Sequence, residues 1–171
     1  FAGFGGAPAP ARSKQKTETR DLPLRARRKR WQVESFATVL RELLEARRQE
    51  ASRVSEIESG VKERPLTVVD FGAGSGALAL PLAARFPDAR FVAVEMKRRS
   101  ADLLLQRAKS AGLENVRTRV CMIETFDEPF DVGVALHACG NATDHALLRC
   151  VERGAAFAVS PCCVGKLKFS L

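Results

Sequence analysis

The run D-F-G-A-G-S-G from Asp70 to Gly76 limits most strongly what this chain can fold into. It follows a short apolar segment, Leu66 to Asp70, and precedes an alanine- and leucine-rich segment, Ala77 to Phe86. Because glycine has no side chain, the three glycines of this run let the backbone turn tightly and let a ligand approach it closely. A turn of this kind between a strand and a helix predicts the first βα unit of a nucleotide-binding sheet.

The rest of the chain repeats this alternation of strand and helix. The apolar patterns predict further strands at Ala89 to Glu95, Val116 to Met122, Phe130 to Leu136 and Ala155 to Ser160. They predict helices from Ser100, as N-cap, to Ala111, and from Asn141 or Thr143 to about Gly154. Alternating strands and helices form βαβ units with right-handed crossovers, so we expect an α/β fold with a parallel sheet.

Two cofactors fit the glycine run. A dinucleotide loop reads G-x-G-x-x-G/A, which Gly72, Gly74 and Ala77 satisfy. Asp70 favours S-adenosylmethionine (SAM), because a carboxylate there attracts the cationic amino acid end of SAM and repels a dianionic pyrophosphate. Glu95 ends the next strand, where a carboxylate can accept hydrogen bonds from both ribose hydroxyls. With Gly76 as third glycine, the run resembles motif I of class I SAM-dependent methyltransferases.

Further cofactor contacts are expected at the carboxyl ends of the strands. Beyond Asp70, the glycines and Glu95, the predicted contacts are Ala73, Met96, Ile123, Glu124, His137 and Ala138. Methyltransferases place an acidic residue after the third strand to hold the adenine amino group; Glu124 either plays that part, with Ile123 against the ring, or is a solvated loop acid. His137 is a candidate catalytic base for a hydroxyl acceptor, or it only shapes its loop.

Two more stretches carry a family resemblance: L-H-A-C-G-N-A-T-D from Leu136 to Asp144, and S-P-C-C from Ser160 to Cys163. The first resembles a stretch of the eukaryotic tRNA acceptor-stem ribose 2′-O-methyltransferases. Both resemble the methyltransferase-like domain of the glutathione S-transferase C-terminal-domain-containing proteins. The form P-C-C-x-G, from Pro161 to Gly165, is closer to these proteins than to the tRNA enzymes. The resemblance spans about Arg28 to Lys166 and implies a Rossmann-like, SAM-binding fold and an RNA substrate.

The net charge of +8 is concentrated in one segment. Arg12 to Arg30 holds nine basic and two acidic residues, which is +7 and leaves +1 for Trp31 to Leu171. We expect residues 1–30 to be a disordered basic arm, residues 31–60 a helix, and residues 65–171 the methyltransferase-like domain. Such an arm binds RNA through its phosphates; the alternatives are a solvated tail and the remnant of an organelle-targeting segment.

The five cysteines lack the spacing of a disulfide framework, which indicates an intracellular, reducing compartment: cytoplasm, nucleus or mitochondrion. His137, Cys139, Cys162 and Cys163 end neighbouring strands and could converge. Because adjacent cysteines reach one ion with difficulty and no C-x-x-C spacing exists, no metal site is predicted. No apolar run approaches the roughly 20 residues of a membrane helix, so no membrane contact is expected.

The chain stops at Leu171, shortly after the fifth predicted strand, whereas a complete domain of this type has seven. We therefore expect a C-terminally incomplete sheet of five parallel strands flanked by helices. Its fifth strand would present an apolar edge, which a partner subunit would cover. Two functions stay open: a SAM-dependent methyltransferase acting on RNA, and a catalytically inactive, methyltransferase-like subunit of a ribonucleoprotein such as an organellar ribosome.

Overall fold

The computed structural model describes residues 22–57 and 64–162. The chain divides into two units, Phe1–Gln32 and Val33–Leu171. Within the described residues, no helix is both long enough and apolar enough to cross a bilayer.

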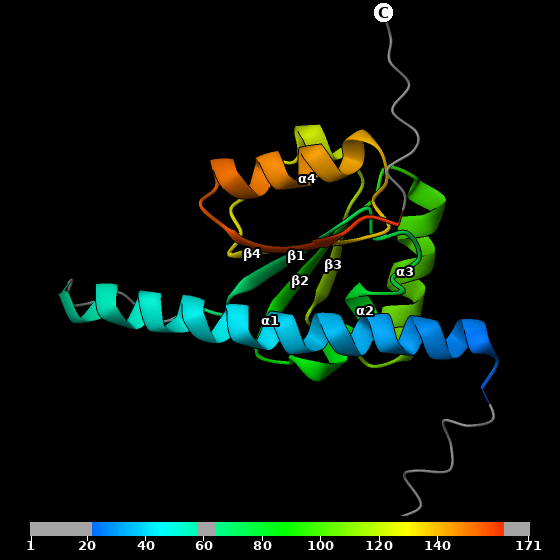
Figure 1. Cartoon of the computed structure of the whole chain (residues 1–171), viewed down its shortest axis with the longest axis horizontal. Helices are drawn as coiled ribbons and strands as arrows, with labels where there is room; N and C mark the ends of the chain where they lie inside the picture. The colour runs from blue at the N-terminus through cyan, green and yellow to red at the C-terminus, as the bar shows by residue number, and fades with distance from the viewer. Residues whose placement is uncertain (1–21, 58–63, 163–171) are drawn as a thin grey trace, which may run out of the picture. The chain divides into compact units, whose positions relative to one another are not determined.

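The second unit is built on a five-stranded parallel sheet (Figure 1). The strands are β1 (Thr67–Phe71), β2 (Arg90–Val94), β3 (Val116–Arg119), β4 (Val132–Leu136) and β5 (Ala156–Ser160). Their order is β3-β2-β1-β4-β5, and all neighbours run parallel. The chain thus winds outward from β1 in both directions, and the order reverses between β1 and β4. This confirms the predicted Rossmann-like α/β fold and places a ligand at the carboxyl ends of these two strands.

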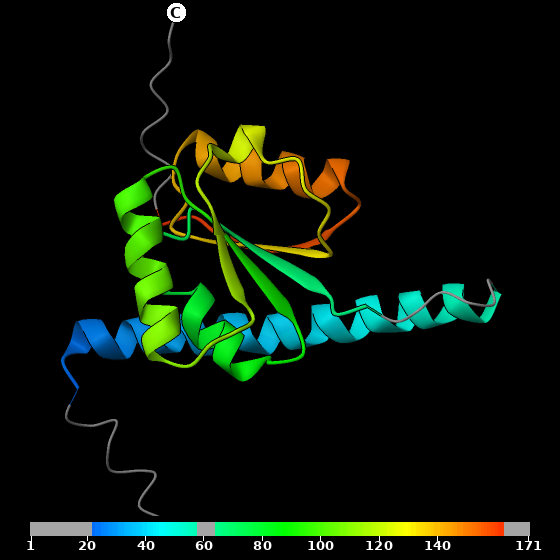
Figure 2. The ribbon, with the colours of Figure 1, turned by 180° about the vertical axis from the view of Figure 1, so that it is seen from behind.

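Helices cover both faces of the sheet (Figures 1 and 2). They are α1 (Leu24–Ile57), α2 (Ala79–Arg85), α3 (Arg98–Ser110) and α4 (Asn141–Glu152), with a short 3₁₀ helix, η2 (Ile123–Thr125). On one face, the buried side chains of Phe36, Leu40 and Leu44 from α1 pack in one cluster with Val68 and Val132. On the other face, Val69 and Phe71 pack in a cluster with Ala146 and Cys150 of α4. Alternate residues of β1 therefore serve the two opposite cores.

The helix α1 begins at Leu24, earlier than the expected start at Trp31. Leu24 to Arg30 is helical, so the expectation of a disordered arm is wrong for these residues, while residues 1–21 lie outside the described part. Arginine and lysine are strong helix formers, and this outweighs the high charge of the segment. Pro23 stands just before the helix, where its missing N–H costs nothing, and its carbonyl accepts the Arg27 N–H at 3.0 Å.

Two predicted helix caps are also wrong. The N-cap of α3 is Lys97 rather than Ser100, and the N-cap of α4 is Gly140 rather than Asn141 or Thr143; neither cap makes a side-chain hydrogen bond. The Thr143 hydroxyl instead donates to the Ala138 carbonyl. The turns that precede these helices are shaped by the site at the carboxyl ends of the strands, which overrides local capping preference.

Candidate functional site

The glycine loop that follows β1 is tied to the end of β2 through its own backbone. Gly72, Gly74 and Gly76 all have positive φ, at 71°, 56° and 86°, which glycine adopts without strain. The N–H groups of Gly72 and Ala73 both donate to the Val94 carbonyl, at 2.9 and 3.0 Å. The Gly76 N–H donates to the Ala73 carbonyl at 3.0 Å. The loop therefore uses these N–H groups internally and does not aim them at a phosphate.

Asp70 lies beneath this loop. Its side chain is buried, and its Oδ2 accepts the Ala79 N–H, at the first residue of α2, at 3.1 Å. A carboxylate at a helix N-terminus is stabilised by the helix dipole. In a dinucleotide site the pyrophosphate would take this same position at the helix N-terminus. The geometry thus favours SAM over a dinucleotide, and the bond to Ala79 shows that Asp70 also supports the loop from below.

Glu95 bridges the glycine loop and the turn after β2. Its Oε2 accepts the Gly74 N–H at 2.9 Å, and its Oε1 accepts the Lys97 N–H at 2.9 Å. A carboxylate has about four lone-pair sites, so these two bonds leave acceptor capacity for ribose hydroxyls. A Cβ built on Gly74 meets no atom within 4 Å, so the loop faces open space here. An open, glycine-lined cradle beside a carboxylate fits the adenosyl part of SAM.

The loops after β3 and β4 bring other predicted contacts to the same end of the sheet. Ile123 is buried in η2, and Ala138 lies 3.8 Å from where a Cβ on Gly72 would be. The Met96 side chain is exposed. Glu124 is half-exposed, and its Oε1 lies 3.1 Å from Nε2 of His145 on α4. Glu124 is therefore tied to α4 through His145.

His137 follows β4 in a conformation that side chains rarely adopt. Its φ is 66°, and within the described residues it is the one non-glycine residue with positive φ. The His137 N–H donates to the Ser160 carbonyl of β5 at 3.1 Å, and the residue is exposed. Backbone strain of this kind concentrates at functional sites, because the surroundings must impose it.

Arg107 supports the glycine loop, and the sequence did not predict this role. From α3, its Nη1 donates to the carbonyl and the hydroxyl oxygen of Ser75, at 3.1 and 2.9 Å. It braces the outer side of the glycine loop. In the sequence it reads as one of several cations on an amphipathic helix, and no local pattern indicates that it contacts the loop.

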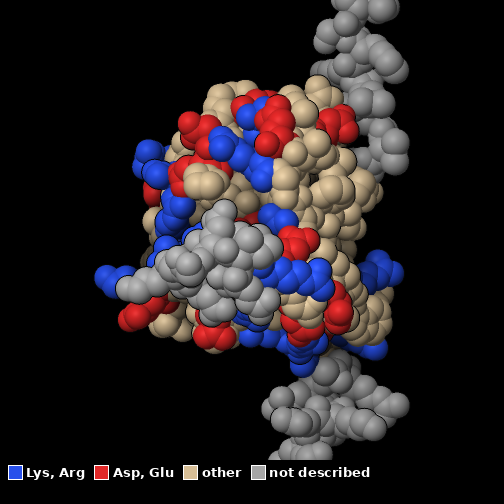
Figure 3. All heavy atoms as spheres, turned by 90° about the vertical axis from the view of Figure 1, so that its left-hand side faces the viewer, with Lys and Arg blue, Asp and Glu red and all other residues tan. Residues whose placement is uncertain are grey.

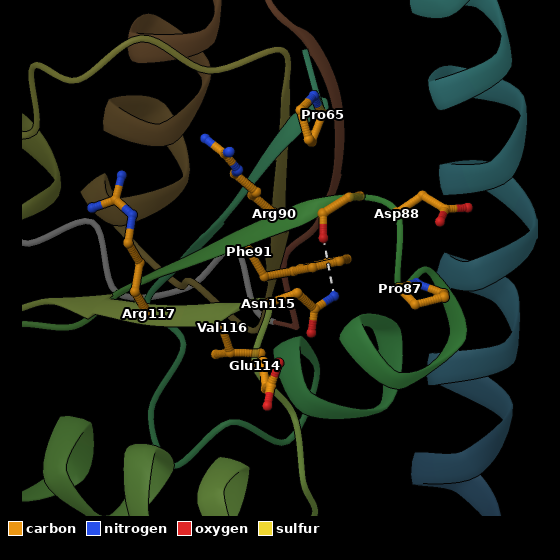
Figure 4. Close-up of a pocket in the computed structure, with 10 residues that line it drawn as sticks. Pro65, Pro87, Asp88, Arg90, Phe91, Glu114, Asn115, Val116 and Arg117 are labelled. Atoms are coloured by element: carbon orange, nitrogen blue, oxygen red, sulfur yellow. Dashed lines mark hydrogen bonds between the residues drawn. The ribbon is translucent and has the colours of Figure 1, made fainter.

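A hollow of about 540 Å³ opens at the amino ends of β2 and β3, away from this site (Figure 4). Its wall is held together by Asn115, whose Nδ2 donates to the carbonyls of Ala83, Phe86 and Ala89. Ligands of open parallel sheets bind at the carboxyl ends of the strands. The hollow is therefore at the wrong end of the sheet to be the cofactor site.

Of the four residues that could converge at the ends of β4 and β5, two are seen to meet. The sulfur atoms of Cys139 and Cys162 lie 2.8 Å apart. Cys163 is outside the described residues. In the portion of the chain that the structure describes, no three His, Cys, Asp or Glu side chains are grouped to hold a metal ion.

Comparison with known proteins finds a family and relatives that match most of this chain. A family model described as "Methyltransferase domain" matches residues 28–169. The glutathione S-transferase C-terminal domain-containing protein of Xenopus laevis is 34% identical over 119 residues, which are 70% of this chain and 19% of that protein. Its Drosophila melanogaster homologue is 34% identical over 128 residues, 75% of this chain and 22% of the homologue. The chain thus spans about a fifth of these relatives.

Two further proteins have RNA in their names. The ribosomal RNA small subunit methyltransferase G of Porphyromonas gingivalis is 37% identical over 65 residues, 38% of this chain and 29% of that enzyme. Among solved structures, an rRNA methylase from Streptococcus thermophilus matches with a TM-score of 0.47 and 20% identity, covering 57% of this chain and 61% of that one.

Proposed function

This chain belongs to the methyltransferase-domain family, and we propose that it is a SAM-dependent methyltransferase domain that acts on RNA. The observation that carries the proposal is the buried Glu95 carboxylate, which accepts the Gly74 N–H at a point of the cradle where a Cβ on Gly74 would meet no atom within 4 Å. Asp70, bonded to the first turn of α2, supports that cradle from beneath.

The chain's own residues bind and position the reactants. Glu95 would accept the ribose hydroxyls, the glycine loop would lie against the adenosyl and amino acid parts, and Ile123 would face the adenine. When bound, SAM supplies a methyl group on a cationic sulfur, which an oxygen or nitrogen nucleophile accepts without further activation. The protein's main contribution is then to align the acceptor. For a ribose hydroxyl, a ring nitrogen of neutral His137 would take the proton.

The basic start of α1 supports RNA as the substrate class. Arg25, Arg27, Arg28, Lys29 and Arg30 crowd the first two turns of this helix. The Arg27 guanidinium lies 5.4 Å from the ring centroid of Trp31, whose side chain is 57% exposed. Cations bind phosphates, and an exposed aromatic ring offers a face on which a base can stack.

In the second unit the charges of opposite sign are largely matched. Acidic and basic side chains alternate over the face drawn in Figure 3. Several are paired, as in Arg47–Glu50, Arg64–Asp131, Arg117–Glu128 and Arg149–Glu152. The excess positive charge of the sequence therefore lies mainly in Arg12 to Arg30, which makes this segment the preferred phosphate-binding element of the proposal.

The exposed side of β5 and α4 supports a second candidate, a non-catalytic subunit of an RNA–protein assembly. Among the described strands, β5 pairs with β4 alone. Phe157 of β5 is 47% exposed, and Leu148 and Val151 of α4 are 48% and 68% exposed. Apolar side chains beside an unpaired strand edge suit a protein partner. The two candidates differ in whether the cradle binds SAM.

Calorimetric titration with S-adenosylhomocysteine, the demethylated product, tests the SAM site. Glu95→Gln should weaken binding about 100-fold, because the charged acceptor for the ribose hydroxyls is lost. Glu114→Gln, an exposed acid at the opposite end of the sheet, is the matched control and should bind like the wild type. Equal affinity in both variants would show that Glu95 does not hold the ribose. A wild type that binds no S-adenosylhomocysteine would favour the non-catalytic subunit.

The RNA proposal has a separate test. Replacement of the five basic residues of the first two turns of α1 by Gln should lower the affinity for a structured RNA and reduce the salt dependence of log K by several phosphate contacts. S-adenosylhomocysteine affinity should stay unchanged in this variant. RNA binding with an unaltered salt slope would contradict the role of this segment.

A further inference from the structure

Cys139 and Cys162 are brought together by the pairing of β4 with β5. Leu136 is in register with Ser160, and the His137 N–H bonds to the Ser160 carbonyl, so the two strands leave the sheet side by side. Cys139 follows β4 and Cys162 follows β5, and their sulfur atoms are 2.8 Å apart.

The separation suits a direct bond between the sulfurs better than a shared metal ion. Zn–S distances of about 2.3 Å in a tetrahedral site keep two thiolates about 3.8 Å apart. The observed 2.8 Å is well below that value. Only a small movement would bring the sulfurs to the roughly 2.05 Å of a disulfide.

The pair is also more reachable from solvent than the buried Cys150. Cys162 is exposed and Cys139 is half-buried. Cys150 is fully buried beneath α4, and this burial raises the pKa of its thiol to about 11. Burial also raises the pKa of the Cys121 thiol. Oxidants that act on thiolates should therefore select Cys139 and Cys162.

Cys139 lies within the loop that closes the cofactor site. The preceding residue, Ala138, approaches Gly72 of the glycine loop, and its carbonyl accepts the Thr143 hydroxyl of α4. The following residue, Gly140, is the N-cap of α4 with φ of 66°. Shortening the 2.8 Å separation to a covalent bond would draw Cys139 toward the end of β5 and shift the adjoining Ala138 from its place beside Gly72.

We propose that Cys139 and Cys162 form a reversible disulfide that locks the loop after β4 and thereby weakens SAM binding. The effect on SAM rests on the function proposed above, whereas the formation of the disulfide does not. Because the bond would displace Ala138 from the glycine loop and hold it there, the reduced form should bind more tightly.

The oxidant is a small-molecule disulfide. The thiolate of the more exposed Cys162 attacks one sulfur of that disulfide, whose S–S bond breaks and releases one small thiolate. The Cys139 thiolate then attacks Sγ of Cys162 in the mixed disulfide and releases the second small thiolate. The two protein thiols lose two electrons to the small disulfide, and their two protons pass to the released thiolates.

The experiment incubates the full chain with graded ratios of reduced and oxidised glutathione, followed by peptide mapping under non-reducing conditions. We expect a Cys139–Cys162 cross-linked peptide that disappears in Cys139→Ser and in Cys162→Ser and persists in the control Cys121→Ser. A Cys163→Ser variant checks the neighbouring residue and should also keep the cross-link. Failure of the wild type to cross-link, a cross-link that depends on Cys163, or retention of zinc by the purified protein would overturn the pairing.

Titration with S-adenosylhomocysteine then measures the consequence. Oxidised wild type should bind about tenfold more weakly than reduced wild type, within the usual range of coupling between sites. Cys139→Ser should bind equally under both conditions. Equal affinities of the two wild-type forms would refute the regulatory role. A reduced protein that does not bind at all would refute the SAM function and leave the cross-link result standing on its own.

Discussion

Three glycines with positive φ offer a way to separate strain, packing and ligand contact in this fold. Gly112 ends the turn after α3 with φ of 66°, and a Cβ there meets nothing within 4 Å. Gly74 shares both properties but lies in the cradle. Gly76 has φ of 86°, and its Cβ would lie 2.7 Å from Cγ of Leu80 and 2.8 Å from Cγ of Leu104. Replacement of each by alanine therefore adds one physical effect at a time.

The expected magnitudes follow from these contacts. Gly112→Ala should cost about 1–2 kcal/mol of unfolding free energy, which is the penalty of the left-handed conformation alone. Gly76→Ala adds an overpacking cost of about 1–3 kcal/mol, because branched Cγ atoms on α2 and α3 cannot move away easily. Its total is about 2–5 kcal/mol. Gly74→Ala should resemble Gly112→Ala in stability while losing affinity for S-adenosylhomocysteine, because its methyl group enters the space that the cofactor would occupy.

Urea denaturation of the three variants and the wild type measures the stabilities, and calorimetry measures the affinities. Gly112→Ala provides the matched control for both. If Gly76→Ala is no less stable than Gly112→Ala, the packing of Leu80 and Leu104 around the loop is wrong. If Gly74→Ala binds like the wild type, the open side of the loop is not the cofactor surface.

Two further predictions concern ion pairs outside the site. Asp131 accepts two bonds from the Arg64 guanidinium, at 2.7 and 2.8 Å, and one from the Thr67 N–H at 2.7 Å; Asp131→Ala should therefore cost about 2–3 kcal/mol in urea denaturation, as expected when a buried N–H loses its acceptor, and an unchanged midpoint would contradict this. A hydrogen bond from Arg117 and a weaker effect of a hydrogen bond from Arg119 lower the pKa of the Glu128 carboxyl. The stability that this pair contributes is present above the unfolded pKa of about 4.5 and is lost as the pH falls through the lower folded pKa. The difference in unfolding free energy between wild type and Glu128→Gln should therefore be present at pH 7 and vanish in acid. A difference that stays constant with pH would refute the stabilisation by the ionised Glu128 carboxylate.

The sheet and its helices were predictable from the sequence because their signals are local. The apolar face of α1 at Phe36, Leu40 and Leu44 and the short apolar strands each report burial through their own periodicity. The start of α1 and the caps of α3 and α4 were not, because helix ends are decided by competition with the turns beside them. Glu95 overrides a serine cap by holding the Lys97 N–H.

What the sequence by itself determined is the chemistry available at the site: a glycine loop after a buried aspartate, a carboxylate at the next strand end, and a histidine and cysteine after β4. What only the tertiary structure decided is how these groups are used. Asp70 bonds to α2 beneath the loop, Arg107 reaches Ser75 from another helix, and Cys139 meets Cys162 across a strand pair. Residue type and spacing are carried along the chain, whereas contacts between distant segments exist only after β4 and β5 pair and α3 packs beside the loop.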